Sequence, residues 1–181
     1  MTRDECLSLV KQNCANQNLL KHMIATEAVM AGLAERLGAD RDSWARAGLV
    51  HDLDYDETAK TPERHGLVSA EMLMQLGFAE DIVHAVKAHN CHAPRESLMD
   101  KALYATDPVT GLVVAAVLMH PTKKLANVDV EFVMRRFKEK RFAAGANREQ
   151  IQSCSELGLS LEEFVGIAIQ SMQRVAGELG F

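Results

Sequence analysis

The sequence of 181 residues contains few cysteines and no long apolar run. Its four cysteines, Cys6, Cys14, Cys91 and Cys154, form no Cys-x-x-Cys pair, so we expect no disulfides in a reducing compartment. The longest apolar run, Leu112 to Met119, is shorter than a membrane-spanning helix requires. No charged start followed by a long apolar stretch marks a signal peptide. These absences predict a cytoplasmic protein that does not enter a membrane.

The sequence also lacks an excess of positive charge and the composition of a disordered chain. It is 48% hydrophobic and 25% charged, with a net charge of −5, which fits a folded domain with a sizeable core. Between Lys123 and Arg148, eight basic residues stand against three acidic ones, so this segment is +5 and the remainder −10. The overall acidity argues against general nucleic-acid binding, whereas the basic segment could contact a phosphate.

Alternating strand patterns and linker-like stretches are missing, and helical periodicity dominates. We therefore predict an all-α fold of about eight to nine helices in one domain. Residues 18–37 form the clearest helix, closed by Gly38. Residues 55–64 are expected to form a loop, and His65 is expected to open the next helix. Pro108 is expected to separate two helices, one over 98–106 and one that runs to Met119.

Two sequence spacings near the end of the chain predict how the last helices begin. Asn147 with Gln150, and Ser160 with Glu163, have the spacing of capping boxes. In a capping box the cap side chain and the side chain three residues later each bond the other's backbone N–H.

The stretch GLVHDLDYDE (48–57) takes an apolar run directly into a histidine and an aspartate. A buried carboxylate is costly unless a metal ion, an arginine or an exposed helix end compensates it. His22 lies on an apolar helical stripe, His65 and His89 lie at predicted helix ends, and Asp107 ends an apolar segment. A single histidine is more often a satisfied or exposed side chain than a ligand. Together, however, these side chains predict a transition-metal site.

The order of these residues resembles the H…HD…D signature of the HD-domain superfamily of metal-dependent phosphohydrolases. Its elements here are His22, the pair His51-Asp52, and Asp107, while His65 and His89 resemble the additional histidines of two-metal members. The resemblance implies an HD-domain-like helical bundle over residues 1–181, with a metal-binding core at about 20–120 and a C-terminal helical extension at about 121–181. It also implies a ligand set in which Asp52 bridges two ions: His22, His51, Asp52, His65, His89 and Asp107.

Short stretches outside the signature are similar to a group of small bacterial HD proteins of undefined function. They are Thr110-Gly111-Leu112, Lys123-Lys124-Leu125-Ala126 and Phe142-Ala143-Ala144-Gly145. After the HD pair, many HD phosphodiesterases continue with Ile-Gly-Lys or similar, whereas this chain has Leu53-Asp54-Tyr55 and so lacks that lysine. Asp54 and Asp56 are either partners that orient ligand histidines or parts of a solvated acidic loop.

The resemblance implies hydrolysis of a phosphorylated small molecule, with a nucleotide expected, by metal-activated water. The expected cofactors are one or two divalent transition-metal ions: Mn, Fe, Zn, Ni or Co. Asp52 and His92, the latter as proton donor, are the predicted catalytic residues. Lys123, Lys124 and Arg141 are the predicted substrate-binding residues, because their cations suit a phosphate. An HD-type di-iron oxygenase stays open as an alternative, because the ligand types suit iron as well as other transition ions. A non-catalytic HD signalling module is a further alternative, against which the intact ligand set counts.

Overall fold

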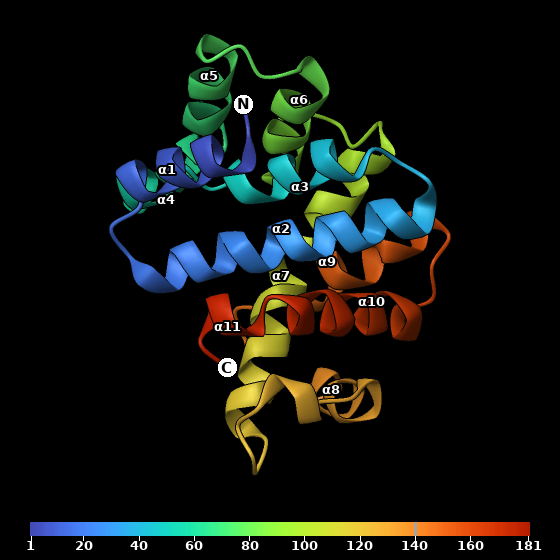
Figure 1. Cartoon of the computed structure of the whole chain (residues 1–181). Helices are drawn as coiled ribbons and strands as arrows, with labels where there is room; N and C mark the ends of the chain where they lie inside the picture. The colour runs from blue at the N-terminus through green and yellow to red at the C-terminus, as the bar shows by residue number, and fades with distance from the viewer. Residues whose placement is uncertain (140) are drawn as a thin grey trace.

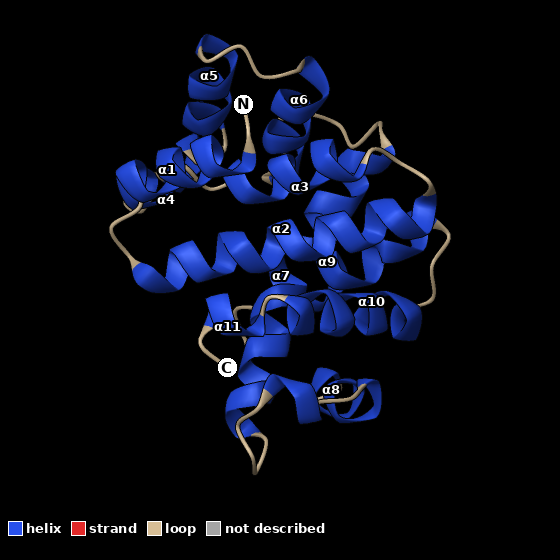
Figure 2. Cartoon of the chain, in the orientation of Figure 1, coloured by secondary structure: helices blue, strands red, loops and turns tan. Residues whose placement is uncertain are grey.

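The computed structural model describes residues 1–139 and 141–181, and the regular structure of this part is helical, with no strand (Figures 1 and 2). The predicted all-α fold is confirmed. Two of its α-helices, α4 and α11, are single turns of four residues, too short for periodicity to reveal. Lys140, in the basic segment, lies outside the described residues. The elements are α1 (Arg3–Asn13), α2 (Gln17–Leu37), α3 (Arg41–Val50), α4 (Tyr55–Thr58), η1 (Pro62–Arg64), α5 (Leu67–Gln75), α6 (Glu80–His89), α7 (Leu98–Met119), η2 (Leu125–Asn127), α8 (Val130–Phe137), α9 (Arg148–Gln152), η3 (Ser153–Leu157), α10 (Leu161–Arg174) and α11 (Ala176–Leu179).

The long helices α2 and α7 form the centre of the bundle. In Figure 1, α2 crosses the molecule with α1, α3, α5 and α6 above it and α10 and α11 below it. By length and composition α7 could cross a membrane, but 61% of its most apolar 18-residue window is buried. Burial against the other helices therefore accounts for its apolar sequence.

A close approach between α2 and α3 depends on Gly48. A Cβ atom at this position would lie 2.8 Å from the carbonyl oxygen of Thr26 and 2.9 Å from the backbone nitrogen of Glu27. Both neighbours are backbone atoms of α2, so a larger residue would push the two helices apart. Gly48 therefore allows the end of α3, and with it His51, to lie directly beside α2.

The predicted break at Pro108 is wrong, because α7 continues from Leu98 to Met119 with the proline inside it. Proline lacks the N–H that would bond the carbonyl of Tyr104, four residues earlier. The side-chain amide of Gln150 donates to that carbonyl at 2.8 Å. This contact from α9 replaces the missing helical hydrogen bond, and Asp107 lies in mid-helix instead of at a helix end.

The segment before α5 also differs from the prediction. Residues 55–64 contain α4 and η1, and α5 begins at Leu67 instead of His65. Gly66 has φ +83°, and a Cβ there would lie 3.2 Å from the carbonyl oxygen of Val86 and 3.3 Å from the ring of His89. The turn at Gly66 thus holds His65 ahead of the helix and close to α6.

The N-caps of α9 and α10 are where the sequence predicts them, but the predicted capping boxes do not form at these two helices. Asn147 and Ser160 each accept hydrogen bonds from backbone N–H groups of the first helical turn. The side chain of Gln150 bonds α7 instead, and the carboxylate of Glu163 pairs with Arg36 at 2.7 Å. Tertiary partners have replaced the local ones.

Candidate metal centre

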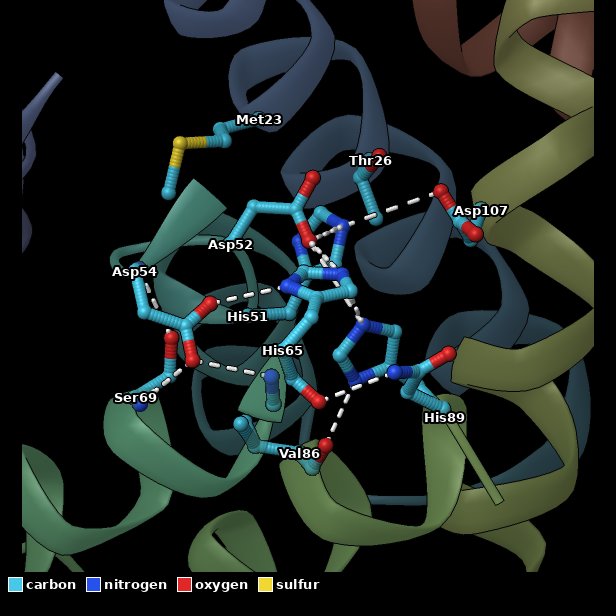
Figure 3. A network of polar contacts seen from close by, with 12 residues as sticks. Met23, Thr26, His51, Asp52, Asp54, His65, Ser69, Val86, His89 and Asp107 are labelled. Carbon is cyan, nitrogen blue, oxygen red and sulfur yellow. Dashed lines mark hydrogen bonds and ion pairs between the residues drawn. The ribbon is translucent and has the colours of Figure 1, made fainter. Parts of the chain in front are cut away.

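Six side chains from separate parts of the chain converge beside α2, α3, α6 and α7 (Figure 3). Their nitrogen and carboxylate oxygen atoms form two groups that share Asp52, and within each group all the potential ligand atoms lie within 4.8 Å of one another. The structure therefore brings together every residue of the predicted ligand set. The first group is His22, His51, Asp52 and Asp107, and the second is Asp52, His65 and His89.

The spacing within the first group suits a single ion. His22 Nε2 lies 3.1 Å from Asp107 Oδ1, 3.3 Å from His51 Nε2 and 3.5 Å from Asp52 Oδ2. Bonds of about 2.1 Å to one ion place ligand atoms about 3.0 Å apart at right angles and about 3.4 Å apart at tetrahedral angles. These distances lie near those values, while His51 Nε2 is 3.3 Å from Asp52 Oδ1 and 3.8 Å from Asp107 Oδ1. An ion could therefore sit among the four side chains after small shifts of the ligand atoms.

The second group has the same spacing around the other carboxylate oxygen of Asp52. Asp52 Oδ1 lies 3.3 Å from His65 Nε2 and 3.5 Å from His89 Nε2, and these two nitrogens are 3.3 Å apart. Asp52 thus presents Oδ2 towards His22 and Oδ1 towards His65 and His89. This orientation allows one carboxylate to contact two neighbouring ions.

Backbone carbonyls set the ring orientation of His51 and His89. His51 Nδ1 donates to the carbonyl oxygen of Gly48 at 2.9 Å, and His89 Nδ1 donates to that of Val86. A carbonyl oxygen can only accept, so the proton of each neutral ring resides on Nδ1. The lone pair on Nε2 is therefore directed into the cluster.

Side chains orient the other two histidines in the same way. His65 Nδ1 bonds Asp54 Oδ1 at 2.8 Å, and His22 Nδ1 bonds Thr110 Oγ1 at 3.0 Å. Thr110 donates its own proton to the carbonyl oxygen of Asp107 at 2.9 Å, so its hydroxyl accepts from His22. All four imidazoles thus have an acceptor at Nδ1 and a free lone pair at Nε2, which is the usual arrangement of metal-binding histidines.

Asp54 is one of these supporting residues and is itself buried. It accepts from the backbone N–H groups of Gly66 at 2.8 Å and Ser69 at 2.9 Å in addition to His65. Burial opposes its charge, but the His65 and Ser69 contacts outweigh burial and lower the pKa of Asp54. Asp56 instead accepts from the backbone of Ala15 at 2.8 Å. Of the two readings, Asp54 orients a candidate ligand and Asp56 does not.

The electrostatics of the cluster favour a positive charge at its centre. Asp52 Oδ1 is buried without a hydrogen-bond partner, and the Nε2 atoms facing it carry no proton in the neutral rings. Burial by itself raises the pKa of Asp52, but the surrounding imidazoles hold it well below its usual range. For His65, burial disfavours the charged form and so lowers the pKa, but Asp52 and Asp54 raise it to about 10. Positive charge on or beside these imidazoles is therefore favoured.

A pocket of about 610 Å³ opens over the first group of ligands. It contains His22, Asp52 and Asp107 in its wall, with further walls from α2, α4, α7 and the loop before α9. The described residues that line it include no lysine or arginine. Its size falls within the range of small-molecule sites.

Comparison with known proteins bears directly on this arrangement. A family model described as HD domain matches residues 19–118, more than half of the chain. The chain belongs to the HD domain family. No solved structure matches it.

Curated relatives of this HD domain carry the name Ribonuclease Y. The protein from Nitratidesulfovibrio vulgaris is 30% identical over 96 residues, which are 53% of this chain and 18% of the relative. The one from Desulfotalea psychrophila is 28% identical over 138 residues, 74% of this chain and 26% of the relative. The one from Salinispora arenicola is 30% identical over 95 residues, 52% and 16% of the two chains. The chain thus spans about a quarter or less of the length of these relatives.

The other predicted site residues of this HD domain do not belong to the cluster of candidate ligands. They are His92, Lys123, Lys124 and Arg141. Lys123 and Lys124 follow the end of α7, about 18 Å of helix beyond Asp107, and they are absent from the pocket wall. Their predicted contact with substrate stays a prediction. Arg141 is exposed, two residues before Ala143, which does line the pocket.

His92, the predicted proton donor, does not line the pocket over the cluster. Its Nε2 donates to the backbone carbonyl of His65 at 2.9 Å. This bond links the segment after α6 to the segment that carries His65, and the role of His92 as proton donor stays a prediction.

Sequence reasoning missed Thr110 and the role of Gly66. Thr110 lies three residues after Asp107 on α7, so the two share a helix face, and this spacing was the available signal.

The basic segment has mainly structural contacts, of which Arg148 makes the most. Its guanidinium donates to the carbonyls of Phe137, Phe142, Ala143 and Ala146 and so fixes the loop beside the pocket.

Proposed function

We propose that this HD domain holds two divalent transition-metal ions and hydrolyses a phosphate ester of a small molecule, with a nucleotide as the expected substrate, in the cytoplasm. The observation that carries the proposal is the convergence of four Nε2 lone pairs and two carboxylates. His22, His51, Asp52 and Asp107 would hold one ion, and His65, His89 and Asp52 the other. When bound, such ions lower the pKa of water and neutralise a phosphate in displacement reactions.

Charge supports an anionic substrate. Two divalent ions would bring +4, whereas the ligand carboxylates Asp52 and Asp107 supply −2 and the histidines bind as neutral rings. The excess positive charge would attract a phosphate group. Arg141 would add to this attraction, because the loop that follows it lines the pocket.

The relatives support phosphate-ester chemistry in the same way. The name Ribonuclease Y denotes action on RNA, in which the bonds between nucleotides are phosphodiesters. A shared HD domain makes a nucleotide or a short RNA the first substrate class to test. The overall fold analogy does not choose among these substrates.

The protein's own residues would fix the positions of the ions and of the substrate held by them. Asp54 and Thr110 would fix the rings of His65 and His22, so that ligand atoms need no reorganisation during reaction. The buried Asp52 would keep both ions on one carboxylate. Gln150, by completing the hydrogen bonding of α7 beside Pro108, would keep Asp107 in place.

The test begins with metal analysis of protein purified without chelator. The metal-loaded protein should then release phosphate or nucleoside from at least one member of a panel of nucleotides and dinucleotides. Chelation should stop the reaction and Mn²⁺ should restore it, whereas Asp52→Asn should be inactive. Asp56→Asn is the matched control, because the carboxylate of Asp56 accepts from the backbone of Ala15 and belongs to neither group of candidate ligands.

Oxygen uptake measured in parallel separates the main alternative. Protein that contains two irons, consumes dioxygen with an organic substrate and releases nothing from the phosphate esters would refute hydrolysis in favour of an oxygenase. Protein that binds metal but lacks both activities would support a signalling module.

A further inference from the structure

A second pocket, of about 470 Å³, adjoins the metal centre and is mostly apolar. It runs between α2, α7 and α11. In Figure 1, α7 and α11 lie below α2. We call it the side groove. Its apolar wall consists of Ala25, Val114, Leu118, Leu179 and Phe181.

The side groove and the metal pocket share the walls His22 and Gly111. His22 is also a candidate ligand, so the groove begins beside the first group of ligands. Gly111 lies on the α7 face of Asp107, one turn further on. A Cβ at Gly111 would meet no atom within 4 Å, so a larger side chain there would extend into the open space beside both pockets.

The two helices line the groove by a regular pattern. On α2 the lining residues are Asn18, Lys21, His22 and Ala25, and on α7 they are Thr110, Gly111, Val114 and Leu118. Both sets follow helical spacing, so each stripe carries a group at the metal centre and then continues as groove wall. A molecule held at the ions would have its attached group directed along these stripes.

The chemistry of the wall indicates what the groove accepts. Exposed apolar side chains are unfavourable in water, and Leu118 is 55% exposed in the groove wall. At the α2 side, Asn18 and Lys21 are exposed and offer an amide and a cation. The wall therefore suits an apolar, ring-sized group with a polar edge.

We infer that the side groove binds the organic part of the phosphate-ester substrate and that Gly111 determines the size of the group that can enter it. This inference rests on the proposed function, in which the ions hold the phosphate. It assigns the substrate class as phosphate esters of an apolar or aromatic group. Small polar phosphate esters would leave the groove empty.

The test compares benzylphosphonate with methylphosphonate, which differ by one phenyl ring and are not hydrolysed. Binding of each to Mn²⁺-loaded protein is measured by calorimetry. The wild-type protein should bind benzylphosphonate roughly tenfold or more tightly, as burial of a phenyl ring predicts. Gly111→Leu should remove most of this preference, and Mn²⁺ content should stay unchanged because Gly111 is not a candidate ligand.

Further variants separate the groove from general effects. Gly111→Ala adds one carbon and should reduce the preference by a smaller factor, while Leu118→Ala should weaken benzylphosphonate alone. Met119→Ala is the control, because Met119 is exposed on the same helix but does not line the groove.

Three results would overturn the inference. They are a wild-type protein without preference, a Gly111→Leu protein that keeps the full preference, and a Gly111→Leu protein that loses both ligands equally. Failure of the proposed function looks different, because the metal-loaded wild type would then hydrolyse no ester while its binding preference for the phenyl ring remained measurable.

Discussion

Replacement of Asp54 by asparagine should selectively weaken the second metal position. Asp54 accepts three hydrogen bonds, from His65 Nδ1 at 2.8 Å and from the backbone of Gly66 and Ser69 at 2.8 and 2.9 Å. Asparagine keeps the shape, but its NH2 group can only donate and must face at least one of these donors. At least one N–H then loses its acceptor, and the His65 ring loses the carboxylate that fixes it.

The magnitude follows from these contacts. A buried donor left unsatisfied costs about 1–3 kcal/mol, which in a chain of this length lowers the Tm by about 2–12 °C. Loss of a partner that orients a ligand costs about 10–100-fold in metal affinity. We expect this loss at the position of His65 and His89, with the first position, where Thr110 orients His22, affected much less.

The assay is a titration of metal-free protein with Mn²⁺, read as stoichiometry and two affinities, together with thermal unfolding. Asp56→Asn serves as the matched control and should bind both ions as the wild type does. Two ions bound to Asp54→Asn with wild-type affinity would refute the assigned role of Asp54. Equal weakening at both positions would show that the effect is not confined to His65.

Three other predictions concern the same centre. Asp52→Ala should lose both ions and His65→Ala mainly the second, as measured by metal content; unchanged content in Asp52→Ala would exclude a shared carboxylate. Gly48→Ala should be overpacked against α2 at a cost of about 1–3 kcal/mol and should lose metal at the first position, whereas Gly177→Ala, where a Cβ meets nothing within 4 Å, should unfold like the wild type. The pKa of His65 is raised to about 10, above the unfolded value, so in metal-free protein its contribution to stability is full below about pH 6.5 and is lost as pH rises towards 10. Metal must displace that proton, so calorimetry in buffers of different ionisation enthalpy should show proton release at pH 7, and binding without release would contradict the assignment.

Local sequence determined the helical character of the chain and the candidates for the metal centre. Periodicity and caps depend on residues within one or two turns, so the helix over 18–37 was found almost to the residue. The HD pair after an apolar run, with histidines before and after it, predicted a metal site, and the resemblance to the HD-domain superfamily implied the six candidate ligands. The same local reading failed at Pro108, because the group that compensates the proline, Gln150, lies more than forty residues away.

The tertiary structure decided which groups support those ligands and which surround the substrate. Local sequence does not show that Asp54 faces His65 while Asp56 faces the backbone of Ala15, although the two aspartates are only two residues apart. It also does not show that Lys123 lies beyond the end of α7, far from Asp107, or that Gly111 borders two pockets. These features depend on how helices cross, and the crossing depends on contacts between residues distant in the chain, such as Gly48 against the backbone of α2. Sequence order could therefore name the ligands, whereas their orientation, their hydrogen-bond partners and the groove beside them arose only when the helices packed.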